Sequence, residues 1–143
     1  MTTILITGTN RGIGLELAKQ SLEKGWTVYG SARQAVTDPD AHICHHPQFH
    51  DLVFDVTDHE AVRAAAASIS EPIDILINNA GIIGPDRQST LDMDFYGFAK
   101  TFAVNTLAPL AVTQAFLPHL KQSSNQRIIT VSSQMGRMSC AES

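Results

Sequence analysis

Three glycines with a fixed spacing form the part of this sequence best suited to bind a phosphate. The segment from 7 to 14 reads TGTNRGIG and joins an apolar run to a helical pattern. Glycines at such a junction permit a tight turn and let a pyrophosphate approach the backbone, beside the unpaired N–H groups of a helix N-terminus. A purely structural loop is the alternative, which the strand, loop and helix context makes weaker. The candidate phosphate-binding residues are Gly8, Asn10, Arg11, Gly12, Ile13 and Gly14.

Alternating strand and helix patterns surround this loop and predict a parallel α/β sheet. Apolar runs predict strands at 3–7, 26–31, 52–56, 73–77 and 128–132. Helical spacing predicts helices at 12–24, from 57 or 58 to 69, and from 92 to about 120, the last bent or interrupted at Pro109 and Pro118. Right-handed crossovers then give a Rossmann-like, doubly wound sheet of order 3-2-1-4-5 in a three-layer α/β/α fold. Its ligand crevice lies at the carboxyl ends of the strands.

Composition and charge narrow the kinds of partner. The 143 residues are 43% hydrophobic and 17% charged, which suits one domain over 1–143. The formal net charge of -4 gives no electrostatic reason to expect a nucleic acid or an anionic membrane as partner. We find no signal-peptide pattern and no run of eighteen apolar residues, so we expect a soluble, cytoplasmic protein.

A group of histidines and one cysteine before the third predicted strand raises the question of a metal site. The group consists of His42, Cys44, His45, His46 and His50. Pro39 and Pro47 indicate an irregular exposed loop, where no ligand geometry is specified, so we expect no metal. Cys44 and Cys140 lie far apart and form no C-x-x-C motif, and we expect two free thiols.

Four further landmarks follow the glycine loop in order. They are Asp55-Val56 after the third strand, Asn78-Asn79-Ala80-Gly81 after the fourth, Asn105 in the long helix and Ser133 after the fifth strand. Together with the Gly-x-x-x-Gly-x-Gly spacing, they resemble the short-chain dehydrogenase/reductase family over nearly the whole chain. The segments TNRGIGLE, NTLAPL and SSQMG are similar to its C-factor and sniffer-like branch of carbonyl reductases. The resemblance implies hydride transfer between a nicotinamide dinucleotide and a small carbonyl or alcohol substrate.

The residues after the second strand favour NADP over NAD. An NAD site places a carboxylate there, which accepts a hydrogen bond from the ribose 2′-OH. This sequence has Ser31-Ala32-Arg33 at that place, without an acidic residue. Arg33 and Arg11 are both placed to contact a 2′-phosphate. The alternative is that both arginines are solvated surface residues.

The resemblance also assigns residues to the adenine and to the wall beside the nucleotide. Asp55 stands where the family uses a carboxylate to accept from the adenine amino group, with the Val56 backbone nearby. Asp55 as a cap of the next helix is the alternative, and both roles are compatible. Asn79, Ala80 and Gly81 form a turn with short side chains that lets the cofactor lie close, with a simple turn as the alternative.

Two catalytic residues are implied by the resemblance. Hydride attack on a carbonyl builds an alkoxide that must be hydrogen-bonded and then protonated. Ser133 would polarise the carbonyl, and Asn105 would hold a water in the proton relay. Asn105 shares an apolar helix face with Phe98 and Phe102, so we expect a buried amide with hydrogen-bond partners; a purely structural role is the alternative.

The family's proton donor, a Tyr-x-x-x-Lys motif after the serine, has no counterpart among the 143 residues, and we expect it shortly beyond Ser143. Tyr96 precedes Lys100 by four residues but lies before the serine strand, so we interpret that pair as a mimic. Turnover by these residues alone is therefore doubtful, and strands and helices that follow in the family are missing. We expect a longer polypeptide, a partner or a second copy, and a homo-oligomer as the assembly.

Three other functions stay open at this point. They are a non-catalytic dinucleotide-binding or C-factor-like signalling protein, an inactive fragment without the catalytic Tyr and Lys, and, more weakly, a methyltransferase-type Rossmann domain.

Overall fold

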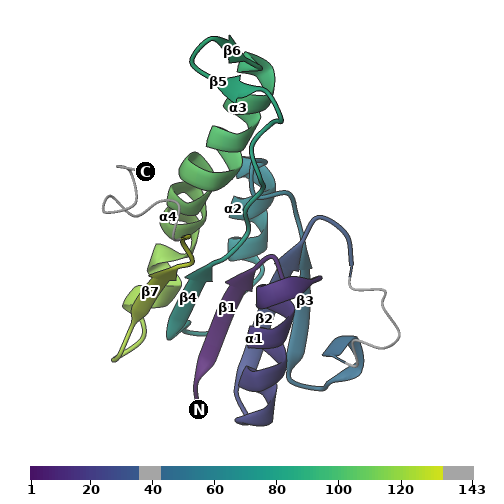
Figure 1. Ribbon diagram of the computed structural model, residues 1–143. Coiled ribbons are helices and arrows are strands. Elements are labelled where there is room, and N and C mark those ends of the chain that lie inside the picture. The colour runs from purple at the N-terminus through teal and green to yellow at the C-terminus, as the bar shows by residue number, and fades with distance from the viewer. Residues whose placement is uncertain (36–42, 134–143) are drawn as a thin grey trace.

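A parallel five-stranded sheet forms the frame of the computed structural model, which describes residues 1–35 and 43–133 (Figure 1). The strands are β1 (Thr3–Thr7), β2 (Thr27–Ala32), β3 (Phe49–Val53), β4 (Ile75–Asn78) and β7 (Arg127–Thr130). They lie in the order β3-β2-β1-β4-β7, and every neighbouring pair is parallel. Because β7 is the fifth strand of this sheet, the predicted order 3-2-1-4-5 and the Rossmann-like fold are confirmed.

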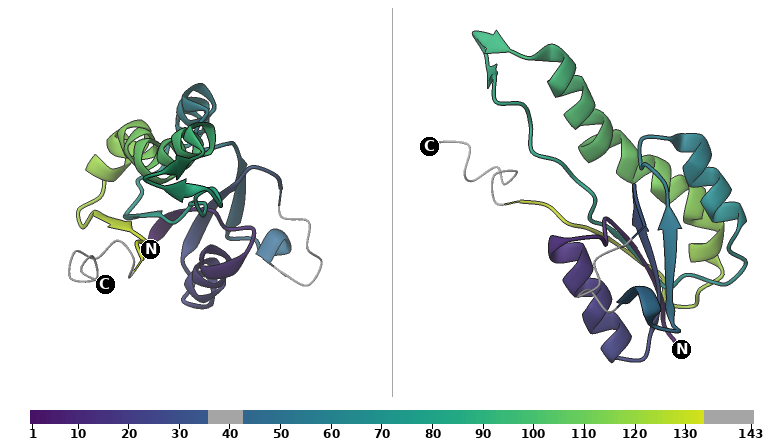
Figure 2. Two further views of the ribbon diagram at one scale, coloured as in Figure 1. Left: turned by 45° about the horizontal axis from the view of Figure 1, so that its top comes forward. Right: turned by 90° about the vertical axis from the view of Figure 1, so that its right-hand side faces the viewer.

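Helices cover both faces of the sheet (Figure 2). The core clusters show that β1 contributes side chains to both layers. Helix α1 (Gly12–Glu23) lies on one face, and α2 (His59–Ala67) and α4 (Ala108–Lys121) lie on the other. Leu5 belongs to the core with Phe116 of α4, whereas Ile4 and Ile6 belong to the core with Ala18 of α1. A strand between two helical layers needs apolar side chains at successive positions, which is why β1 has no polar alternation.

A long helical segment extends beyond the carboxyl ends of the strands (Figure 1). It consists of α3 (Phe95–Phe102), a π-helical turn η2 (Ala103–Leu107) and α4, and a small hairpin of β5 (Gln88–Ser89) and β6 (Asp92–Met93) lies at its far tip. The expected interruption near Pro109 is present, because η2 ends just before it and Pro109 occupies the first turn of α4. Pro118, by contrast, lies inside α4 and does not end the helix.

Two local boundaries also differ from the prediction. The third strand begins at Phe49, three residues earlier than expected, because β3 is an edge strand whose polar residues pair with β2. Phe54 and Val56 follow the strand but are buried. Their apolar side chains made the predicted strand end too late in the sequence. Helix α2 begins at His59, and Asp58, rather than Asp55, caps it by accepting a hydrogen bond from the N–H of Ala61 at 3.1 Å. Among the described residues, no helix has the length and apolar character needed to span a membrane.

Candidate dinucleotide site

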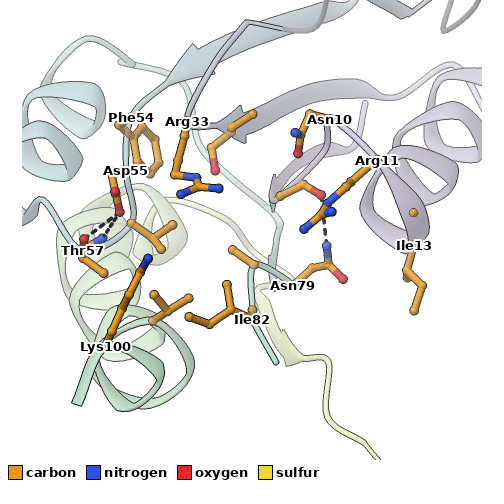
Figure 3. Close-up of a pocket in the computed structure, with 18 residues that line it drawn as sticks. Asn10, Arg11, Ile13, Arg33, Phe54, Asp55, Thr57, Asn79, Ile82 and Lys100 are labelled. Atoms are coloured by element: carbon orange, nitrogen blue, oxygen red, sulfur yellow. Dashed lines mark hydrogen bonds between the residues drawn. The ribbon is translucent and has the colours of Figure 1, made fainter. Parts of the chain in front are cut away.

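A cavity of about 620 Å³ opens at the carboxyl ends of the central strands, between the glycine loop and α3 (Figure 3). Its volume lies within the range of about 300–1,000 Å³ that is usual for small-molecule sites. All the residues predicted to bind the cofactor line it, with the exception of Gly14: Gly8, Asn10, Arg11, Gly12, Ile13, Arg33, Asp55, Val56, Asn79, Ala80 and Gly81. The sheet topology therefore brings motifs from four separate loops to one place.

Backbone geometry explains the glycines of the loop. Gly8 and Gly12 have φ angles of 76° and 59°, which residues other than glycine rarely adopt. The N–H groups of Gly8 and Thr9 donate to the carbonyl of Ser31 at 2.7 and 3.0 Å, so the loop is attached to the end of β2. Gly14 lies inside the turn, where a Cβ would overlap the Gly8 carbonyl oxygen. Gly14 thus serves the packing of α1 rather than the cavity wall.

The N-terminus of α1 carries no anion of its own. Asp58 and Asp94 cap α2 and α3 with their carboxylates, whereas the N-cap of α1 is Arg11, which makes no capping hydrogen bond. The first turn of α1 also contains no acidic residue. The helix end that borders the cavity therefore has neither a side-chain cap nor an acidic residue to offset its partial positive charge, which suits it to bind an anion.

Asn79 fixes the wall opposite the glycine loop. Its side-chain amide donates to the carbonyls of Thr7 and Gly8, each at 3.1 Å. The backbone N–H groups of Asn79 and Ala80 both donate to the Thr7 hydroxyl at 3.0 Å. These bonds join the ends of β1 and β4, so the turn from Asn79 to Gly81 is held at a fixed distance from the loop.

Asp55 is held in its ionised form within a positively charged lining. The backbone N–H and the hydroxyl of Thr57 donate to its carboxylate at 2.9 and 2.7 Å and lower the pKa of Asp55, and the cations of Arg33 and Lys100 lower it further. The charged residues of the lining are Arg11, Arg33 and Lys100 against Asp55 alone. A cavity with an excess of positive charge in a chain of net charge -4 is suited to an anion.

Lys100 is the charged cavity residue that sequence reasoning missed. The sequence marked Lys100 only as the end of the Tyr96-x-x-x-Lys100 mimic. The position of α3 above the carboxyl ends of the strands is a tertiary feature that the local sequence does not show. Tyr96 itself is 86% exposed and is not among the described residues that line the cavity.

Asn105 lies in the π-helical turn and is bonded to one backbone position. Its Oδ1 accepts from the Ile82 N–H at 2.9 Å, and its Nδ2 donates to the Ile82 carbonyl at 2.8 Å. The expected burial is wrong, because Asn105 is exposed, as are Phe98 and Phe102. Both atoms of its amide nevertheless help to attach the long helical segment to the loop after β4, and Ile82 lines the cavity.

Ser133 follows β7, at the same edge of the sheet as the other motifs. The N–H of Val131 continues the pairing with β4 by donating to the Asn78 carbonyl at 3.0 Å. Ser133 is exposed and is not among the described residues that line the cavity. Asn105 is not among them either, so neither of the two predicted catalytic residues forms part of the cavity wall.

The histidine-rich segment makes ordinary side-chain contacts. The rings of His50 and Tyr29 stack with centroids 4.7 Å apart, and His46 Nδ1 accepts from the Gln48 N–H at 3.1 Å. Within 1–35 and 43–133, no group of three or more His, Cys, Asp or Glu side chains is arranged to hold a metal ion. His42 and Cys140 lie outside the described residues, and Cys44 is a free thiol.

Comparisons with known proteins agree on one family. Residues 2–143 match the family model described as short chain dehydrogenase. The probable NADP-dependent dehydrogenase of Haemophilus influenzae is 31% identical over 140 residues, which cover 94% of this chain and 54% of that protein. The C-signal protein of Myxococcus xanthus is 42% identical over 78 residues, covering 54% of this chain and 46% of that protein.

Solved structures give the same result. The crystal structure of an NADPH-bound carbonyl reductase from chicken fatty liver matches with a TM-score of 0.85 and 29% identity, over 97% of this chain and 62% of that chain. The chain spans about a third to about a half of the length of the first curated relatives that it matches.

Proposed function

The chain belongs to the short chain dehydrogenase family, and from this membership we propose that it forms the dinucleotide-binding part of an NADP-dependent oxidoreductase. The carrying observation is the positively lined cavity at the uncapped N-terminus of α1. Such a site offers N–H groups and cations to a pyrophosphate, while the glycines keep side chains out of its path.

NADP, rather than NAD, is the proposed cofactor. The end of β2 carries Arg33 and no carboxylate, so a 2′-phosphate would meet a cation there instead of a repelling charge. Arg11 lies across the cavity as a second cation (Figure 3). NADPH in the chicken carbonyl reductase and the NADP dependence named for the Haemophilus relative support this assignment.

A carbonyl or alcohol is the proposed substrate class, in line with the carbonyl reductase structures. When bound, the nicotinamide would supply or accept the hydride. Ser133 would then donate a hydrogen bond to the substrate oxygen, where negative charge develops. Asn105 would support the proton relay through its place beside Ile82. The residues described here would thus bind and orient the cofactor and polarise the substrate.

Binding of the two reduced dinucleotides tests the proposal directly. Isothermal titration calorimetry of the 143-residue chain with NADPH and NADH should give heat with both and tighter binding of NADPH. Exchange of Arg33 for Ala should remove most of that difference, while Arg63→Ala, on the exposed side of α2, serves as the matched control. Absence of binding by either dinucleotide to a monodisperse sample would contradict the site, and tighter binding of NADH would contradict the choice of NADP.

A signalling role without turnover is the second candidate, favoured by the 42% identity to the C-signal protein over 78 residues. Stopped-flow oxidation of NADPH with a panel of carbonyls, using the full-length protein, separates the two. Binding without turnover would support the signalling role and exclude the enzyme.

Two further expectations from the sequence stay proposals. Self-association is supported by the large apolar side chains exposed on α3 and α4, among them Phe95, Phe98 and Leu110. A cytoplasmic location would be tested by fractionation of cells that express the tagged full-length protein.

A further inference from the structure

We propose that Lys100 of α3 binds the 2′-phosphate of the dinucleotide together with Arg33, so that it helps to select the phosphorylated cofactor. This inference rests on the proposed function, since it deepens the role of the same cavity. Its basis is the position of the side chain, which lies on a different element from the predicted cofactor residues.

The geometry brings Lys100 to the side of the cavity that holds the ends of β2 and β3. Figure 3 shows the Lys100 side chain extending from α3 toward Asp55, and the Arg33 guanidinium also lies on the cavity side of that carboxylate. Both cations act electrostatically on Asp55. Lys100 therefore belongs to the part of the lining where an adenosine would lie, away from the first turn of α1, where the pyrophosphate would bind.

Lys100 also keeps its donors available. Among the described residues, the salt bridge found joins Arg87 and Asp92, whose charged atoms lie 3.4 Å apart. Within that part of the chain, Lys100 therefore forms no salt bridge. A lysine ammonium on a flexible stem reaches a phosphate as a point charge with three donors. A solvated surface lysine is the ordinary alternative, since the residue is exposed. Its place in the lining of a positively charged cavity argues against that alternative.

The charge of Asp55 gives Lys100 a selective role. Asp55 stays ionised because Thr57 and the two neighbouring cations lower its pKa, so a doubly charged phosphate beside it would be repelled. Arg33 alone offsets one negative charge, and Lys100 provides a second positive charge in the same part of the cavity lining. NADH carries no 2′-phosphate, so removal of Lys100 should weaken NADPH binding far more than NADH binding.

Calorimetry on matched variants tests this proposal. The variants are Lys100→Met, Lys100→Arg and, as the control, Lys121→Met, which removes the same charge at the exposed end of α4. The probes are NADPH, NADH and 2′,5′-ADP, which contains the phosphorylated adenosine without the nicotinamide. Circular dichroism checks that each variant keeps its helices.

Lys100→Met should weaken the binding of NADPH and of 2′,5′-ADP roughly five-fold and the binding of NADH less than two-fold, as expected for a partly solvated charge pair. Lys100→Arg should retain most of the affinity, and Lys121→Met should match the wild type. An equal loss for NADPH and NADH, or no loss for either, would overturn the role of Lys100. If the wild-type chain binds neither dinucleotide, the proposed function itself fails, and this result is distinguishable from a failure confined to the Lys100 variants.

Discussion

Gly14 shows how a single missing side chain fixes the dinucleotide loop. A Cβ at this position would overlap the Gly8 carbonyl oxygen and come within 2.6 Å of the Asn79 amide nitrogen, so both the glycine loop and the turn after β4 would have to move. We predict that Gly14→Ala destabilises the fold by about 1–3 kcal/mol, the usual cost of overpacking. Urea unfolding measures this loss, with Glu16→Ala on the exposed side of α1 as the control. An unchanged midpoint for Gly14→Ala would contradict the packing argument.

Tyr29 should titrate abnormally at alkaline pH. Burial, with the hydrogen bond from its hydroxyl to Glu71 at 2.7 Å, raises the pKa of Tyr29 from 10.0 to about 12. The neutral form is favoured in the fold, so the stability that Tyr29 contributes is complete below pH 10 and is lost as the pH rises toward about 12. The difference in tyrosinate absorbance between the wild type and Tyr29→Phe, followed as the pH rises, should report the pKa of Tyr29.

Glu71→Gln provides the control for that titration. It should lower the pKa of Tyr29 only in part, because burial is the larger cause and remains. Titration of Tyr29 near its ordinary pKa of 10.0 in the folded wild type would show that the buried contact is not maintained.

Residue types predicted which residues would meet in the cavity. Glycine and arginine have specific uses in a phosphate loop, so their spacing identified residues that the fold then brought together. Lys100 and Ile82 were missed because their place depends on where α3 lies, which is a tertiary property. The Tyr29 to Glu71 bond was missed for the same reason, since its partners are 42 positions apart.

At the scale of elements, η2 and Asn105 attach the long helical segment to the loop after β4. A π-helical turn adds a residue to the helix and is frequently found at functional sites. Asn105 lies in this turn, where both atoms of its amide reach the backbone of Ile82. Asn105 therefore attaches the loop after β4 to the helical segment at this turn.

We predict that Asn105→Ala loosens the loop locally. The Ile82 N–H would lose its acceptor, so its hydrogen exchange should accelerate roughly ten-fold, as expected for one lost hydrogen bond. Asn105→Asp should have an intermediate effect, because a carboxylate accepts from the Ile82 N–H but cannot donate to its carbonyl. Thr106→Ala, at the next position of the turn, is the control, and nuclear magnetic resonance measures the exchange. Unchanged protection of Ile82 in Asn105→Ala would contradict the attachment.

The sequence predicted the elements more reliably than their ends. Buried strands such as β1 leave a continuous apolar pattern, and the topology rules then determined the sheet order. The start of β3 was displaced because an edge strand contains polar residues, and burial continued past its end to Phe54 and Val56. The hairpin of β5 and β6 was not predicted, because its strands have two residues each and leave no periodic pattern.

For the whole molecule, the distribution of apolar surface separates the sheet core from the helical segment. The strands and α4 enclose a core in which Leu5, Leu76 and Phe116 are completely buried. On α3 and the outer side of α4, by contrast, large apolar side chains are exposed, including Phe95 at 79% and Leu110 at 58%. Exposed apolar surface of this extent is typical of an interaction site.

We predict that the 143-residue chain self-associates through this surface. Leu110 and Leu117 lie seven residues apart on the same side of α4 and are both exposed, so a charge at Leu110 would be buried in any contact made there. Sedimentation velocity over a range of concentrations should show association of the wild type and a shift toward monomer for Leu110→Glu. Gln20→Glu adds the same charge on α1, on the opposite face of the sheet, and should behave as the wild type. A wild type that stays monomeric, or a Leu110→Glu variant that associates equally well, would exclude α4 as the contact.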